Sequence, residues 1–447
     1  MESWMIAFSV IIGYMALVLI IGFLTYKPAR KITADEYFLM GKKIGPFLLF
    51  WTTLATLQSA FAFLGAVGKF YVEGIDFIVL PLSQGLMITV LTFVIGHRLW
   101  LLAKNRGYLT PPDFFDDRYR SVLLRLIVSF IGIFFTLFYL AMQYVGSAHA
   151  ISGITGGHVP YLISLVIVTI VTGLYTILGG MRAVVWTDVI QGILLFSMSI
   201  VATCYVVSAL GGIPAVLAKI AEVKPEYLAL PGPAKVYTDI NWIMFFLVLP
   251  FGIWLGPQIM IRFFAARDKK SIYAAALSIP ISQIWLFLIA GPLLGFSAYL
   301  VYGPNLPRPD QALPRLMADF APVFLGSFVM AGAIAAAMST VDSMVLVITQ
   351  MIAKDFIIVG ARKKLPEEKI VLLGRVIAAI LTAISFIIAF SPPRLLINVI
   401  IGITFTAIAQ LAPGVILGFF WRRANKYGIT SGLVAGIVIL FTLRALR

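Results

Sequence analysis

Long apolar runs separated by short polar stretches cover almost the whole chain. Each run holds about twenty residues or more, the length that a helix needs to cross the hydrocarbon core of a membrane. The first run follows Glu2 rather than a basic leader, which favours a retained span over a signal peptide. The pattern predicts twelve spans, at 4–26, 46–70, 76–101, 122–150, 160–178, 186–210, 241–263, 271–301, 320–352, 371–390, 395–420 and 428–446.

The composition agrees with membrane helices. Of the 447 residues, 61% are hydrophobic and 12% are charged, whereas soluble proteins average about 25% charged residues. Many of the 37 glycines and 23 prolines lie inside the apolar runs, which fits interrupted helices better than the short alternating segments of a β-barrel. We therefore expect an all-α polytopic membrane protein without a separate soluble domain.

The net charge of +15 is distributed as membrane topology requires. Of the 34 lysines and arginines, 25 are assigned to one predicted side and 9 to the other. The positive-inside rule places the first side in the cytoplasm, so both termini are expected outside. The charge thus favours a multi-pass protein of the cell membrane over a protein that binds nucleic acid.

Two apolar runs contain residues that disfavour a continuous helix. Residues 51–68 include three threonines, a glutamine and a serine. On composition alone, a continuous helix whose hydroxyls bond to the preceding turn is favoured there, and local unwinding is the alternative. Residues 249–257 hold two prolines and two glycines, which predicts a broken helix.

These two runs, the second and seventh spans, lie five spans apart, the offset of a five-plus-five inverted repeat with a midplane site. The spacing therefore predicts one transporter domain. Its parts are a leading helix at 4–26, a first repeat at 46–210, a second repeat at 241–420 and a trailing helix at 428–446.

The ninth span carries a stripe of small residues at helical spacing: Gly332, Ala336, Ser339, Thr340 and Ser343. Small residues let another backbone approach closely. Two hydroxyls that face unwound carbonyls of a neighbouring helix would form an oxygen cage for a hard monovalent cation. Tight helix packing is the alternative, but it does not explain Asp342, because a carboxylate at that depth needs a cation or a donor.

Other candidate chemistry is sparse. Thr187 and Asp188 follow a Gly-Gly pair and a tight turn, where they would most simply cap the next helix. The three histidines and Cys204 share no metal-ligand spacing, and the sequence has no phosphate loop, nucleophile elbow or zinc-protease motif. We therefore expect a protein that is not an enzyme and uses no organic cofactor.

Five stretches of this sequence resemble the sodium/solute symporter family, which transports sugars, proline, pantothenate, iodide, monocarboxylates and sialic acid. They lie at 58–65, 179–191, 256–268, 335–343 and 412–423, in the expected order, so the resemblance covers nearly the whole chain. The specific ones are 179–191, with its Trp-Thr-Asp core, and 335–343, with its Met-Ser-Thr-Val-Asp-Ser end. The resemblance implies a leucine-transporter-like fold and sodium as the coupling ion.

The resemblance also implies binding residues. The shared sodium site of the family would be formed here by the carbonyls of Ala55, Gln58 and Ala336 and the hydroxyls of Ser339 and Thr340. Some members place another sodium ion beside the Thr-Asp carboxylate, which would here use Asp188 with Ser339, Asp342 and Ser343. The alternative role of Asp188 is in the cytoplasmic exit path of sodium.

The substrate residues that the resemblance implies come from five spans: Ser59, Phe61, Gln84, Gln143, Trp254 and Phe405. This chain has Phe61 and Ala62 where sugar transporters of the family carry acidic and amide groups. It has Leu249 and Ile253 where proline transporters carry aromatic residues. A mainly apolar pocket with a few amides and hydroxyls favours a small carboxylate or amino acid over a sugar.

The resulting hypothesis is import of a small organic solute by sodium-driven alternating access. One alternative is a proton-coupled transporter in which Asp188 or Asp342 titrates. The neutral cage of hydroxyls and carbonyls disfavours it. A second alternative is a transporter-like sensor that binds solute without moving it. The expected partners are the solute, sodium and the lipid bilayer.

Overall fold

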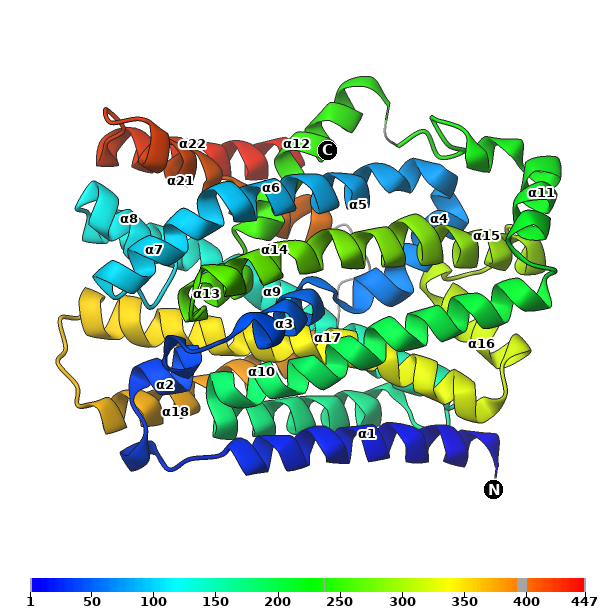
Figure 1. Ribbon diagram of the computed structural model, residues 1–447, viewed down its shortest axis with the longest axis horizontal. Coiled ribbons are helices and arrows are strands. Elements are labelled where there is room, and N and C mark those ends of the chain that lie inside the picture. Colours follow the sequence, from blue (N-terminus) through cyan, green and yellow to red (C-terminus); the bar gives the residue numbers. More distant parts are fainter. Residues whose placement is uncertain (1, 237, 392–399, 446–447) are drawn as a thin grey trace.

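The computed structural model describes residues 2–236, 238–391 and 400–445, which form a bundle of helices (Figure 1). Within these residues, the β contacts are limited to an isolated bridge between Ile44 and Ala266. The helices before residue 230 are α1 (Ser3–Thr25), α2 (Ala34–Leu39), α3 (Pro46–Leu57), α4 (Ala66–Glu73), α5 (Val79–Ser83), α6 (Thr89–Leu91), α7 (His97–Arg106), α8 (Pro112–Tyr119), α9 (Val122–Ile154), α10 (Tyr161–Ala209) and α11 (Ile213–Val223). Those after it are α12 (Asp239–Trp254), α13 (Pro257–Ala265), α14 (Lys269–Gln283), α15 (Gly291–Tyr302), α16 (Ala312–Phe320), α17 (Val323–Met351), α18 (Glu367–Phe390), α20 (Thr406–Ala409), α21 (Ala412–Phe420) and α22 (Lys426–Ala445).

Wider π-helical turns join several of these helices end to end. They are η3 (Phe61–Gly65), η5 (Gln84–Ile88), η6 (Thr92–Gly96), η8 (Ile284–Ala290), η10 (Ile352–Gly360) and η11 (Ile400–Phe405). Short 3₁₀ turns form η1 (Ala29–Lys31), η2 (Met40–Lys42), η4 (Gly74–Ile78), η7 (Pro225–Leu228) and η9 (Pro309–Gln311). The predicted span at 395–420 begins in residues 392–399, which lie outside the described residues, as does the end of the span predicted at 428–446.

Nine helical stretches of the described residues are long and apolar enough to cross a membrane, and α12 and α13 form a tenth, bent by 55°. Two of the nine, Phe61–Arg106 with 46 residues and Tyr161–Ala209 with 49, would be about 70 Å long if straight, more than twice the thickness of the hydrocarbon core. Both are interrupted by a glycine in a conformation that side chains disfavour, Gly74 (φ 66°, ψ −150°) and Gly180 (φ 57°, ψ −150°). Divided at these glycines, and with α3 and Phe61–Glu73 taken as a single crossing, the helices follow the order of the twelve predicted spans.

The helix that begins at Pro46 is broken, contrary to the continuous helix favoured by composition. Helix α3 ends at Leu57, Gln58 is extended (φ −90°, ψ 113°), and the helical path resumes in η3 at Phe61. The broken helix predicted at residues 249–257 is confirmed, since α12 ends at Trp254 and α13 begins at Pro257. Both breaks lie inside apolar runs, where the freed backbone groups require partners from other helices.

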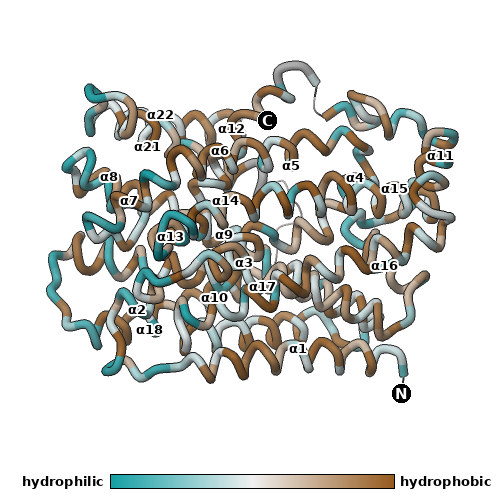
Figure 2. The backbone as a smooth tube through the Cα atoms, viewed as in Figure 1, coloured by the Kyte–Doolittle hydropathy of each residue, from teal (hydrophilic) through white to brown (hydrophobic). Residues whose placement is uncertain are grey.

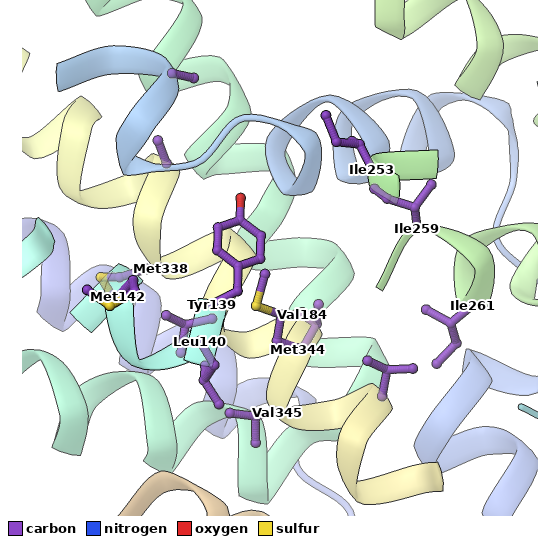
Figure 3. Packing of buried hydrophobic residues seen from close by; sticks show 14 of the residues in the cluster. Tyr139, Leu140, Met142, Val184, Ile253, Ile259, Ile261, Met338, Met344 and Val345 are labelled. Atoms are coloured by element: carbon purple, nitrogen blue, oxygen red, sulfur yellow. The ribbon is translucent and has the colours of Figure 1, made fainter. Parts of the chain in front are cut away.

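Helix α17 is the centre of the bundle. Every residue from Val329 to Met351 is buried, and α17 packs against α1, α9 and α10. Figure 3 shows Met338, Met344 and Val345 of this helix packed near Tyr139 and Leu140 of α9. Figure 2 shows hydrophobic residues along the length of the bundle and hydrophilic residues gathered at its two ends, as expected for a protein that crosses a membrane.

The hydrophilic end that carries α2 and α8 holds a buried ion network. Arg125 of α9 lies 2.6 Å from Asp355 and 2.6 Å from Asp113, and Lys354 lies 2.6 Å from Asp113. Arg125 and Lys354 are among the 25 basic residues assigned to one side, and at that end of the bundle both are ion-paired with aspartates.

Candidate functional site

The break after α3 is stabilised by polar groups of α9 and α17. The N–H of Ala60 donates to Gln143 Oε1 at 3.1 Å. On the other side of the break, Ser339 Oγ lies 2.9 Å from the carbonyl oxygen of Ala55. Thr340 Oγ1 lies 3.4 Å from the carbonyl oxygen of Gln58. Side chains on two neighbouring helices thus partner backbone groups that an unbroken helix would satisfy by itself.

The five residues predicted to bind sodium come together at this break, and we call them the cage. Besides the two contacts above, Ser339 Oγ lies 3.0 Å and Thr340 Oγ1 lies 3.1 Å from the carbonyl oxygen of Ala336. All five residues are buried, and each offers a neutral oxygen atom. Neutral oxygens that converge at such distances suit a hard cation. Sodium binding itself stays a prediction.

A charged cluster of Asp188, Arg262 and Asp342 lies one helical turn further along α17. Arg262 is completely buried, and its Nη2 lies 2.9 Å from Asp188 Oδ2 and 2.7 Å from Ser343 Oγ. The same nitrogen is within hydrogen-bond distance of the hydroxyls of Thr52 and Thr56. A guanidinium therefore lies among the groups that the sequence nominates for a second sodium ion.

Arg262 was counted among the basic residues of one side, and it had no predicted role in a site. It lies in α13 and reaches back into the bundle, where its Nη1 donates to the carbonyl of Gln258 at 2.5 Å. Its position inside the predicted span 241–263 could have predicted its burial. An arginine within a membrane span needs polar or charged partners.

The two carboxylates have different partners. Asp342 accepts a hydrogen bond from the hydroxyl of Tyr175 at 2.8 Å, which supplies the donor that a carboxylate at this depth needs. Asp188 was expected to cap a helix, but the helix resumes before it, and its side chain is paired with Arg262 instead. The hydroxyl of Thr187 bonds back to the carbonyls of Ala183 and Val184.

A small cavity of about 40 Å³ lies beside the cage, and we call it the solute cavity. This volume has room for only a few water molecules. Four of the predicted substrate residues line it: Ser59, Phe61, Gln84 and Phe405. The other lining residues are Thr56, Leu57, Gln58, Ala62, Leu80, Tyr139, Leu249, Ile253, Gln258, Ile259 and Phe287. Figure 3 shows Tyr139, Ile253 and Ile259 in this region.

The two remaining substrate candidates do not line this cavity. The Trp254 indole is buried and donates to Thr92 Oγ1 at 3.0 Å. Gln143 holds the backbone of Ala60 and lines a larger opening on the other side of Phe61. The sequence analysis did not nominate Tyr139 or Gln258. Gln258 directly follows Pro257 at the second helix break, a position that favours a site residue.

The larger opening has a volume of about 770 Å³, and we call it the vestibule. It is lined by η9, α16 and the end of α9, with charged side chains that include Lys69, Arg308 and Arg315. Phe61 lines both the vestibule and the solute cavity. Gly65 leaves space for its ring, because a Cβ atom there would lie 2.4 Å from it.

Comparison with known proteins places this arrangement among transporters. Residues 37–436 match the sequence model of the sodium:solute symporter family. The sodium/pantothenate symporter of Haemophilus influenzae is 27% identical over 409 residues, which cover 90% of this chain and 82% of that protein. The high-affinity proline transporter PutP of Bacillus subtilis is 28% identical over 433 residues, which cover 94% of this chain and 88% of that protein.

Solved structures share the fold. A substrate-bound, outward-open Na⁺-coupled sialic acid symporter superposes with a TM-score of 0.79 at 21% identity, covering 94% of this chain and 88% of that chain. A transporter of the nucleobase-cation-symport-1 family superposes with a TM-score of 0.54 at 14% identity, covering 90% and 92%. The leucine-transporter-like fold expected from the sequence is thereby confirmed.

Proposed function

The chain belongs to the sodium:solute symporter family, and on that premise we propose that it imports a small organic solute together with sodium by alternating access. The observation that carries the proposal is the cage. Its five neutral oxygens join the broken α3 to α17, two elements far apart in the chain. A cation held between them would stabilise one arrangement of the break and thereby the adjoining solute cavity.

We place the end with the basic loops in the cytoplasm and the N-terminus outside. The N-terminus and the vestibule loops lie at the opposite end of the bundle from α2 and α8 (Figure 1). In this orientation the vestibule opens outward, and solute passes Phe61 to reach the solute cavity. Sodium leaves toward the cytoplasm past Asp188, Asp342 and Ser343.

This exit-path role for Asp188 is favoured over a second sodium site because Arg262 already supplies a positive charge at 2.9 Å. One sodium ion per solute is sufficient for accumulation. A single charge that moves through 100 mV yields about 2.3 kcal/mol, which corresponds to roughly 50-fold accumulation at about 1.4 kcal/mol per factor of ten. A sodium gradient would add to this.

The relatives named above transport pantothenate and proline, which supports a small organic solute for this chain as well. The described residues that line the solute cavity include no charged side chain. Sodium in the cage would therefore add a positive charge beside the cavity for a carboxylate. This favours a small carboxylate or an amino acid over a sugar.

The test is the thermal stability of the purified protein in sodium, potassium or choline chloride at equal ionic strength. We expect a saturable increase in Tm with sodium alone, and we expect the Ser339→Ala/Thr340→Ala double variant to lose it. Equal Tm values in the three salts would contradict sodium coupling and favour the proton-coupled alternative. Solute binding in sodium without uptake into proteoliposomes would favour the sensor.

A further inference from the structure

Two glutamines that line the solute cavity have a buried amide oxygen without a hydrogen-bond partner among the described residues. These oxygens are Oε1 of Gln58 and Oε1 of Gln258. The two side chains are only 1% and 4% exposed. An unpaired acceptor buried at membrane depth is costly, so such a group usually has a partner in the functional state. The two residues come from the two helix breaks, one from each half of the chain.

The orientation of the Gln58 amide is fixed by its neighbour. Its Nε2 donates to Ser282 Oγ at 2.9 Å, and the Ser282 hydroxyl donates in turn to the carbonyl of Ile279 at 2.9 Å. With the amide turned the other way, the Ser282 hydroxyl would have to donate to Gln58 Oε1 and give up its bond to Ile279. The orientation with NH₂ toward Ser282 keeps both hydrogen bonds and directs the Gln58 oxygen away from Ser282.

A third glutamine supplies the opposite polarity. Gln84 Oε1 accepts from Gln283 Nε2 at 3.3 Å, which leaves the NH₂ group of Gln84 as a donor at the cavity wall. The cavity thus offers two acceptors from Gln58 and Gln258 and a donor from Gln84. A solute that matches this wall has N–H or O–H groups at one end and an acceptor such as a carboxylate at the other.

We propose that Gln58 and Gln258 determine specificity by accepting hydrogen bonds from a donor group of the solute, an ammonium or a hydroxyl next to a carboxylate. This inference rests on the proposed function and names the solute class for it. Gln58 also connects sodium binding to solute binding. Its carbonyl oxygen belongs to the cage and its side chain belongs to the cavity. Sodium that orders the Gln58 backbone would also fix the acceptor that the solute meets.

The experiment compares three probes of the same carbon skeleton, 2-amino-, 2-hydroxy- and unsubstituted 3-methylbutanoate, by thermal shift in sodium. We expect the amino or the hydroxy acid to raise Tm and the unsubstituted acid to bind at least tenfold more weakly, because it leaves both acceptors unpaired. The amino and hydroxy arms distinguish an ammonium from a hydroxyl donor. Equal binding of all three, or no shift with either donor-bearing acid, would overturn the inference.

Gln258→Met removes the acceptor with little change in volume and adds no charge. We expect it to weaken binding of the donor-bearing acid at least tenfold and to leave the Tm shift with sodium alone unchanged. Gln350→Met is the matched control, since Gln350 is also buried, lacks partners for its amide among the described residues, and lies outside both cavities. It should bind the acids like the parent protein.

These readouts separate the two proposals. Loss of the sodium shift in the parent protein would contradict sodium coupling itself. A normal sodium shift combined with unchanged acid binding in Gln258→Met would contradict only the role of the glutamine pair. Should Gln258→Met fail to fold, the comparison of the three acids on the parent protein still tests the inference.

Discussion

Two polar sites on α17 lie one helical turn apart and differ in how their polar groups are paired. The cage around Ser339 and Thr340 consists of neutral oxygens, and its hydroxyls contact carbonyls of the broken α3. The charged cluster beside Ser343 contains two carboxylates and the buried guanidinium of Arg262. The difference is whether the positive charge is part of the chain or must come from solution.

This difference indicates that the two sites have different roles. A site that holds its own cation has a resident ion pair, which ties α10 and α13 together through Asp188 and Arg262. A neutral cage has no such partner, so an ion can enter and leave it without breaking a salt bridge. We infer that the cluster is a structural anchor and that the cage is the element that responds to sodium.

Removal of the buried Arg262 guanidinium should lower the free energy of unfolding more than any other change considered. Arg262→Ala leaves Asp188 buried without its partner, and breaking a buried ion pair in this way costs about 3–5 kcal/mol. Chemical unfolding in detergent, in the absence of sodium, measures this loss. Arg267→Ala is the control, because Arg267 is 57% exposed and pairs with Asp268 at the surface.

Two results would change the comparison. A loss in Arg262→Ala no larger than in Arg267→Ala would show that the cluster is not an anchor. A stabilisation of Arg262→Ala by sodium that exceeds the sodium effect on the parent protein would identify the cluster as a second sodium site once the guanidinium is removed.

Lowering the pH should weaken the ion networks without affecting sodium binding by the cage, because the cage has no titratable group. Asp113 of α8 provides the test. Burial by itself raises its pKa, but Lys354 and Arg125 together hold the pKa below the ordinary carboxyl value. A lowered native pKa contributes stability that is complete above the ordinary value of about 3.9 and is lost as the pH falls through the native value.

We therefore expect the contribution of Asp113 to Tm to be constant down to about pH 4 and to be lost as the pH falls further, by less than the effect of Arg262→Ala. Asp113→Asn should have a lower Tm at the start and a flatter dependence on pH. The additional Tm gained with sodium should persist over the range in which Asp113 remains ionised. Identical slopes in the two proteins would contradict this role of Asp113.

The smallest effect on the free energy of unfolding is expected for a solvent-exposed ion pair. Arg30 and Glu368 are 2.9 Å apart, but their side chains are 84% and 49% exposed. Water and salt screen such pairs, so Arg30→Gln should change the free energy of unfolding by less than about 1 kcal/mol. The same unfolding experiment measures it. A loss comparable to that of Arg262→Ala would mean that burial does not explain the strength of the central cluster.

The stripe on α17 could be predicted from the sequence because it depends only on helical spacing. Ser339 and Thr340 are adjacent, and Ala336 lies one turn before them, so a regular helix brings them to one face. Their carbonyl partners could not be predicted from composition, which favoured a continuous helix. The break at Gln58 is stabilised by tertiary contacts, from Gln143 and Thr340, that no local propensity encodes.

Arg262 was missed for a similar reason. In sequence it stands at the start of a basic stretch, and its burial depends on Asp188, which is 74 residues away. The counting of basic residues gave the predicted topology because such exceptions are few. The same method cannot tell an arginine in a loop from one that folds back into the bundle.

The shared position of Phe61 has a kinetic consequence. It lines both the vestibule and the solute cavity, its ring packs over Gly65, and its ring centroid lies 6.0 Å from that of Phe77 in an edge-to-face arrangement. A change of the Phe61 rotamer moves one ring, whereas rocking of the helices moves whole elements and takes microseconds to milliseconds. We expect a small solute to pass Phe61 many times before the helices move once. The solute concentration at half-maximal transport then measures equilibrium affinity rather than the rate of access.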